Sequence, residues 1–271
     1  MQAEARPAAS DRAPDGAADA SRSIVAGAVV GGRYCLRQRL HRGANTEVWR
    51  AHDASGGGVA VKLALGSAAA VRLRAEHALL ARLEHAAILR PVAWDGANAA
   101  LVTEYLAGGD LVSLAGDAPR HWAAGALDVL GALAYLHARD IVHRDVKARN
   151  VMFTAQGRAR LIDFGSAAPA GAERRAAGTT AAHRYASTGT IACSDDIHAF
   201  AVLAHELLTG RLPGEGGARA AAARPAAAGG GAAGPRAALE ALVSRTLAAR
   251  DPRGIGSIRA YRDVIESMLA A

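Results

Sequence analysis

Hydrophobic and polar positions follow two different periods along the chain. Between residues 33 and 103, short β-branched segments alternate with turn residues and predict strands at 34–40, 46–53, 59–65 and 99–105. After residue 110, apolar positions recur at helical spacing and predict helices at 123–137, 196–209, 237–249 and 259–269. A β-rich segment therefore precedes an α-rich one, which indicates an α+β fold with two lobes.

One helix, at 68–83, interrupts the predicted strands. Its apolar residues at helical spacing are Val71, Ala75, Ala78, Leu79 and Leu83, which is the pattern of a helix with one apolar face.

The predicted strands and helices belong to one domain, residues 25–271. Residues 1–24 mix Ala, Pro, Asp and Arg without apolar periodicity, and we expect a disordered tail there. The lobes would span about 33–103 and 111–270, joined by residues 104–110. Residues 214–235 are rich in Ala and Gly, which is typical of a low-complexity surface loop.

The composition is that of an ordinary globular protein. With 271 residues, of which 51% are hydrophobic, the chain is long enough to bury a sizeable core. No apolar run of about 18 residues appears, so neither a membrane span nor a signal peptide is indicated. Cys35 and Cys193 are too few and too distant to predict a disulfide framework or a zinc site. We expect a soluble cytoplasmic protein with no membrane partner.

The net charge of +7 comes mainly from scattered arginines. They occur singly or in pairs such as Arg174 and Arg175, without a basic run, so we expect no nucleic-acid partner. Only two of the 32 basic side chains are lysines, Lys62 and Lys147. An ammonium and a planar guanidinium are not interchangeable in a tight phosphate site, so these two positions point to phosphate chemistry.

Three motifs follow one another in an informative order. The chain reads VAVK at 59–62, HRDVKARN at 143–150 and DFG at 163–165. This ordered set resembles the eukaryotic-type (Hanks-type) Ser/Thr protein kinase family, as a bacterial-like member, over about residues 33–270. The resemblance implies a two-lobed protein-kinase-like fold, with a small β-rich N-lobe carrying one key helix and a larger α-rich C-lobe. The implied reaction is Mg²⁺-dependent transfer of the ATP γ-phosphate to Ser or Thr hydroxyls of protein substrates. Nothing in the sequence indicates an oligomeric state.

The resemblance gives residues of the second and third motifs separate roles. Asp145 would accept or orient the proton of the substrate hydroxyl, and Lys147 would direct its ammonium to the transferring phosphoryl group. Asn150 and Asp163 offer oxygen ligands of the kind that Mg²⁺ takes together with nucleotide phosphates. These roles suit phosphoryl transfer, which mainly requires a protein to position groups and to neutralise charge.

Lys62 and Glu76 are expected to form an ion pair. Lys62 would contact the α- and β-phosphates of ATP and needs a fixed partner, which the resemblance assigns to Glu76 on the predicted helix. Arg74 is cationic and Glu84 lies at the helix end, so neither competes for this role. The alternative for Glu76 is an exposed carboxylate, the commoner position of a glutamate.

The resemblance also outlines a nucleotide pocket beside Lys62 and Asp163. Leu40, Val48 and Ala60 would lie above the adenine and Met152 below it, with Thr103 as gatekeeper and Glu104 to Leu106 as hinge. Gly43, in the glycine-rich loop, and Asp110 complete the expected nucleotide-binding residues. The apolar members are equally explained as core residues. Asp110 resembles the acidic residue that meets the ribose or a basic substrate residue, and its alternative role is a helix N-cap.

The glycine-rich loop of the family is altered in this chain. Gly43 is retained, but His41 and Thr46 stand where the family has its other two glycines. Side chains hinder the close approach of the backbone to phosphates, so we expect weaker ATP binding, not its abolition.

The activation segment lacks the Ala-Pro-Glu ending of the family. One alignment places Gly189 at the glutamate, and Ile255 at the buried arginine that pairs with it. Loss of both partners of a buried ion pair costs little, whereas loss of one leaves a buried charge worth roughly 3–5 kcal/mol. Arg253 is an off-register alternative for the arginine.

Two further features bear on regulation. Asp196 matches the family's aspartate that braces the catalytic loop from a buried helix. Arg144 indicates control by an anionic activation segment, for which the candidates are Glu173, Thr179, Thr180 and Ser187.

Two other functions remain open from the sequence. The altered glycine loop and the missing glutamate are compatible with a pseudokinase that acts as a nucleotide-responsive binding or scaffold module. A small-molecule phosphotransferase of related fold is the second alternative, and Lys147 argues against it.

Overall fold

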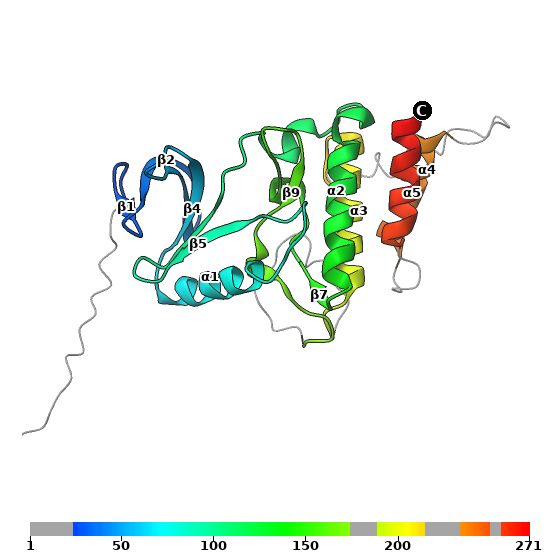
Figure 1. Cartoon of the computed structure of the whole chain (residues 1–271). Coiled ribbons are helices and arrows are strands. Elements are labelled where there is room, and N and C mark those ends of the chain that lie inside the picture. The colour runs from blue at the N-terminus through cyan, green and yellow to red at the C-terminus, as the bar shows by residue number, and fades with distance from the viewer. Residues whose placement is uncertain (1–23, 174–188, 215–233, 250–255) are drawn as a thin grey trace, which may run out of the picture.

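The computed structural model describes residues 24–173, 189–214, 234–249 and 256–271. These residues form a β-rich N-lobe and a helical C-lobe, which Figure 1 shows side by side. The predicted two-lobed α+β fold is confirmed.

The N-lobe contains one antiparallel sheet with the strand order β1-β2-β3-β4-β6-β5. Its strands are β1 (Val29–Val30), β2 (Tyr34–Arg42), β3 (Thr46–His52), β4 (Gly58–Ala64), β5 (Pro91–Asp95) and β6 (Ala100–Glu104). The four strands predicted from alternation are confirmed. The short β1 and the edge strand β5 were missed, and β5 begins with Pro91, a residue tolerated at the start of an edge strand.

The two faces of this sheet have different neighbours. The outer face forms a small core of its own, made of Val30, Tyr34, Leu36, Trp49, Ala51, Val59, Val61, Leu63, Ala100 and Val102. Ile24, at the border of the expected tail, packs against this core. Lys62 and Leu101 are directly opposed on β4 and β6 and therefore share the other face, which we call the inner face. Leu101 there belongs to the main core, which continues into the C-lobe.

Helix α1 (Ser67–Leu80) packs beside the sheet and contacts the C-lobe (Figure 1). The helix was predicted, but its buried residues are Ala69, Leu73, Glu76 and Leu80, whereas Val71 of the apolar stripe read from the sequence is 72% exposed. The helix is Ala-rich on several sides, so apolar spacing alone does not fix which face is buried. It ends at Leu80 instead of residue 83.

In the described part of the C-lobe there are four α-helices and two short strand pairs. The helices are α2 (Pro119–His137), α3 (Cys193–Thr209), α4 (Pro235–Ala248) and α5 (Ile258–Ala270). The strand pairs are β7 (Ile141–Val142) with β10 (Ala168–Pro169), and β8 (Val151–Phe153) with β9 (Ala159–Leu161). All four predicted helices are confirmed. Strand β7 ends just before residues 143–150 and β8 begins just after them, so the two strand pairs fix both ends of this segment.

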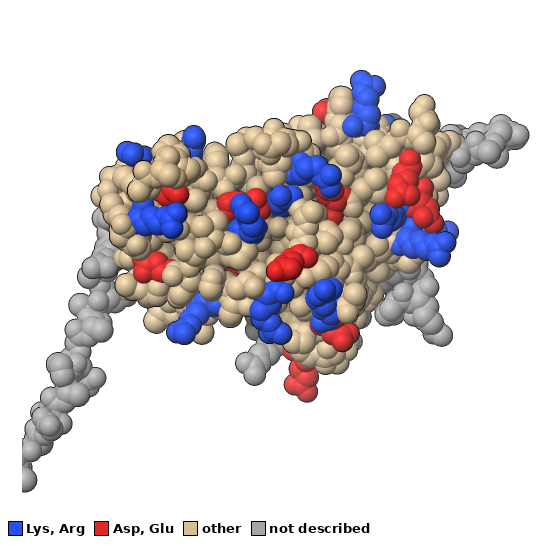
Figure 2. All heavy atoms as spheres, viewed as in Figure 1, with Lys and Arg blue, Asp and Glu red and all other residues tan. Residues whose placement is uncertain are grey.

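Charged side chains are mixed over the visible surface. On the face in Figure 2, Lys and Arg side chains are spread over both lobes beside Asp and Glu side chains. In the described parts of the chain, no helix combines the length and apolar character needed to cross a membrane.

Candidate active site

Residues 143–150, which we call the catalytic loop after their expected role, have their backbone fixed by one carboxylate from α3. Asp196 is fully buried and accepts the backbone N–H groups of His143 and Arg144, each at 2.8 Å. Its Oδ2 also lies 2.9 Å from Nε2 of His137, at the end of α2. Arg144 has a φ of 70°, which a non-glycine residue adopts only at a cost, and the two bonds to Asp196 compensate for it. Asp196 therefore lies where the sequence placed it, whereas the role of His137 was missed.

Asp145 is oriented by its own loop. Its Oδ2 accepts a hydrogen bond from Nζ of Lys147 at 2.7 Å and another from Nδ2 of Asn150 at 2.8 Å. Asn150 also donates to the backbone carbonyl of Asp145. The residue is 6% exposed, and its Oδ1 is buried without a hydrogen-bond partner among the described residues. One oxygen is thus held in place and the other is left able to accept a proton.

A lysine and two carboxylates join both lobes. Nζ of Lys62 lies 2.8 Å from Oε2 and 3.1 Å from Oε1 of Glu76, and 2.9 Å from Oδ1 of Asp163. Glu76 is 4% exposed, so the exposed alternative for this residue is excluded. Three elements, β4, α1 and the segment after β9, place these side chains together.

The charged groups in this cluster shift one another's pKa values. Burial opposes the charged form of Lys62, but Glu76 and Asp163 outweigh it and hold the pKa of Lys62 above its usual value. Burial likewise opposes ionisation of Asp163, yet Lys62 keeps the pKa of Asp163 below its usual value. For Glu76, burial dominates and its pKa is raised despite Lys62. The cluster therefore presents an ammonium ion and, at Asp163, an ionised carboxylate.

Asp163 and Asn150 are the residues that could hold a divalent cation. Asn150 donates through Nδ2, which leaves its side-chain carbonyl oxygen as a ligand. The side chain of Asp163 is 44% exposed, and the backbone N–H of Ile162 donates to the carbonyl of Asn150, which brings the two residues together. Mg²⁺ is typically held by one or two protein oxygens plus phosphates and water, so this donor set fits that ion.

The conformation of the DFG segment is also defined. Asp163 has a φ of 63°, in the left-handed region, and Phe164 is 2% exposed. The Phe164 ring meets the His143 ring edge to face at a centroid distance of 4.7 Å. Burial lowers the pKa of His143, so its imidazole is neutral in the folded protein.

The residues expected around a nucleotide lie on several elements. Val48 and Ala60 are half-buried, and Thr103 is 6% exposed. Val48 lies directly opposite Lys62, whereas Ala60 lies two positions before Lys62 and directly opposite Thr103. All three side chains therefore lie on the inner face. Leu40 lies at an irregularity of the β2–β3 pairing and is 43% exposed. Leu106 is buried.

Asp110 and Met152 pair through an isolated β-bridge, which joins the end of the expected hinge, residues 104–110, to β8. Asp110 precedes a short 3₁₀ helix, Leu111–Leu114, but its side chain makes no capping bond there. The capping alternative for Asp110 is therefore not observed.

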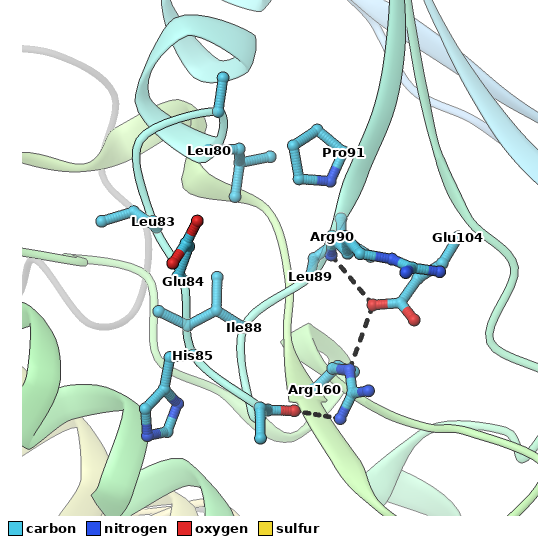
Figure 3. A pocket seen from close by; sticks show the side chains of 12 residues that line it. Leu80, Leu83, Glu84, His85, Ile88, Leu89, Arg90, Pro91, Glu104 and Arg160 are labelled. Carbon is cyan, nitrogen blue, oxygen red and sulfur yellow. Dashed lines mark hydrogen bonds and ion pairs between the residues drawn. The ribbon is translucent and has the colours of Figure 1, made fainter.

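The side chain of Glu104 lies in a separate pocket. It accepts hydrogen bonds from Nε of Arg160 at 3.1 Å and from the backbone N–H of Arg90 at 3.0 Å (Figure 3). The pocket has a volume of about 630 Å³ and is lined by Glu104, Arg160 and several residues between 80 and 91. None of the residues expected to be catalytic lines it. Only the backbone of Glu104 thus remains for the hinge role expected from the sequence.

Several expectations fall outside the described residues. They concern Arg174, Arg175, Thr179, Thr180, Ser187, Arg253 and Ile255. Within the described part, Glu173 forms a β-bridge with Thr190, and Gly189 has a φ of 115°. A glutamate would be strained at that φ, which agrees with a glycine at position 189.

Comparison with known proteins supplies independent findings. A family model described as "Protein kinase domain" matches residues 34–227. CBL-interacting protein kinase 4 of Oryza sativa subsp. japonica is 37% identical over 152 residues, which cover 51% of this chain and 34% of that protein. The probable serine/threonine-protein kinase SCO3848 of Streptomyces coelicolor is 33% identical over 211 residues, 68% of this chain and 31% of that protein. Serine/threonine-protein kinase PknL of Mycobacterium tuberculosis is 32% identical over 212 residues, 71% of this chain and 53% of that protein. The chain thus spans between about a third and a half of the length of these relatives.

Proposed function

The chain belongs to the protein kinase domain family, and on that premise we propose that it is a serine/threonine protein kinase. It transfers the γ-phosphoryl group of ATP to Ser or Thr hydroxyls of protein substrates, in the cytoplasm, where ATP is supplied. Relatives named as serine/threonine kinases in two bacteria support this substrate class.

The observation that carries this proposal is the state of Asp145. One carboxylate oxygen is fixed by Lys147 and Asn150, while the other is buried and lacks a partner among the described residues. A buried acceptor without a donor costs free energy, and such a cost is typical of a site that a substrate donor completes.

Each catalytic residue then has a defined task. Oδ1 of Asp145 accepts the proton of the substrate hydroxyl, whose oxygen forms the new bond to the γ-phosphorus as the bond to the β–γ bridging oxygen breaks. Lys147, which already contacts Asp145, offers its ammonium to the charge on the transferring group. Lys62, held by Glu76, fixes the α- and β-phosphates. Asn150 and Asp163 would hold Mg²⁺, which neutralises phosphate charge when bound.

The pseudokinase alternative depended on the altered glycine loop and the missing glutamate. Against it stand Lys62, Glu76, Asp145 and Asp163, which are retained and lie in the arrangement described above.

A radiolabelled-ATP assay tests the proposal. The purified chain is incubated with [γ-³²P]ATP, Mg²⁺ and casein, alongside Lys62→Arg and Asp145→Asn. We expect label on Ser or Thr with the wild type and a loss of at least about 100-fold with either variant. Equal incorporation by all three proteins would contradict an enzymatic role.

A further inference from the structure

The turn between β2 and β3 is fixed by backbone hydrogen bonds. We call residues 40–48 the glycine-loop hairpin. The N–H of Gly43 donates to the carbonyl of Thr46 at 2.9 Å, which closes the turn. The N–H of Leu65, just after β4, donates to the carbonyl of Asn45 at 2.8 Å and ties the tip to the sheet. The tip of the hairpin therefore has a defined position relative to the end of β4.

A buried carboxylate holds the outer side of the hairpin. Glu47 is completely buried, and its Oε2 accepts the indole N–H of Trp49 at 2.9 Å. Its Oε1 forms an ion pair with Arg42 and lies 3.7 Å from the guanidinium of Arg39. Because these contacts use residues on both strands, they fix the two arms of the hairpin relative to each other.

The strand register places His41 on the inner side. His41 is directly opposite Val48, and Val48 is directly opposite Lys62. Directly opposed residues in antiparallel strands point to the same face, so His41 and Lys62 share the inner face, two strands or about 10 Å apart. The imidazole Nε2 lies 3.4 Å from the point that a Cβ on Gly43 would occupy, so the ring lies at the turn. The side chain is exposed and forms no hydrogen bond within the described residues.

We infer that His41 is a nucleotide-contacting residue, whose imidazole donates a hydrogen bond to the phosphate chain that Lys62 holds. This inference rests on the proposed function. The side chains of His41 and Thr46 limit how closely the hairpin backbone can approach the phosphates. The imidazole of His41 supplies a hydrogen-bond donor to the phosphates from the inner face instead. His41 therefore strengthens ATP binding at a position where the sequence alone indicated a loss.

Affinities for a nucleotide series test this role. ATP, ADP and adenosine are titrated by calorimetry into the wild type, His41→Ala, His41→Gln and His121→Ala, the last removing an exposed imidazole in the other lobe. We expect His41→Ala to weaken ATP and ADP binding about tenfold and to leave adenosine binding unchanged, since one hydrogen bond to a charged group is lost. His41→Gln retains an N–H donor and should stay within about threefold of the wild type, and His121→Ala should match the wild type.

Three outcomes would overturn the inference. The first is an ATP affinity of His41→Ala equal to that of the wild type, and the second is tighter ATP binding by this variant. The third is an equal loss of affinity for ATP and for adenosine in His41→Ala, which would place the imidazole at the ribose or the base. The thermal midpoint of each variant shows whether it is folded. A folded wild type that binds none of the three ligands would instead contradict the proposed function.

Discussion

Two loops of this molecule are each held by a completely buried carboxylate, but in different ways. Asp196 on α3 accepts backbone N–H groups of the catalytic loop, 53 and 52 positions earlier in the chain. Glu47 binds side chains of its own hairpin, from Trp49, Arg42 and Arg39. The loop that carries the proposed catalytic groups is thus fixed through its backbone from the helical core, whereas the hairpin beside the proposed nucleotide site is fixed locally through side chains.

This difference accounts for one departure from the family, the altered glycine-rich loop, beside a catalytic loop whose motif is retained. A backbone anchor makes few demands on the identity of the loop residues, so the side chains proposed as catalytic do not have to hold the loop in place. A side-chain anchor allows the backbone of the hairpin to keep its position even though two glycines are replaced, by His41 and Thr46. We therefore expect the two carboxylates to act on different kinetic parameters.

The largest effect is expected for Asp196→Asn. The amide cannot replace both carboxylate oxygens as acceptors, so a buried N–H group loses its partner, and Arg144 loses support for its positive φ. We expect kcat to fall at least about 100-fold and the free energy of unfolding to fall by about 2–4 kcal/mol. Steady-state kinetics and urea denaturation measure the two quantities.

Asp263→Asn is the matched control for that change. Asp263 lies on α5 in an exposed ion pair with Arg259 at 3.8 Å, and such pairs contribute about 0–1 kcal/mol. If Asp196→Asn behaved like this control, Asp196 would not be the anchor of the catalytic loop.

A smaller and different effect is expected for Glu47→Gln. The amide keeps the shape and one acceptor but loses the charge that holds Arg42 and Arg39, so the hairpin becomes less well fixed. We expect KM for ATP to rise about three- to tenfold while kcat stays within about twofold. A fall in kcat with unchanged KM would show that the hairpin does not serve nucleotide binding.

The smallest effect is on the pH dependence of stability. Burial lowers the pKa of His143, so the unfolded chain binds a proton below about pH 6.5 that the folded protein does not. Stability should therefore fall as the pH decreases from about 6.5 toward the lowered pKa, with a slope of at most about 1.4 kcal/mol per pH unit from this group. Urea denaturation between pH 7.5 and 5.5 should show a smaller loss for His143→Gln than for the wild type. An equal loss would assign the acid sensitivity to other groups.

Much of the fold could be predicted because strands and helices here follow their own periods closely. The exceptions have physical causes. The buried face of α1 includes Glu76, whose partner Lys62 lies on β4, and the apolar spacing of the helix does not show that pair. The strand β5 begins with a proline and lies at the sheet edge, so its local pattern was weak.

The candidate site was predictable where motifs are short and linear. Lys62, Asp145, Asn150 and Asp163 come together as expected from their motifs. Glu47 was missed because an isolated glutamate in a strand usually faces solvent, and its only signal was the alternation that places it on the face of Trp49. The orientation of the Glu104 side chain depends on Arg160, 56 positions away, which no local pattern shows.

The most direct test of the account is a single-turnover experiment on Asp145→Asn. The wild type and the variant are saturated with ATP, Mg²⁺ and a Ser-containing protein substrate, and transfer of the γ-phosphate is followed by rapid quench. The variant keeps the neighbours of Asp145 in place but loses the proton acceptor, so we expect equal ATP binding and transfer at least about 100-fold slower. Transfer at the wild-type rate by a variant that binds ATP equally well would contradict the assignment of Asp145 as the catalytic base.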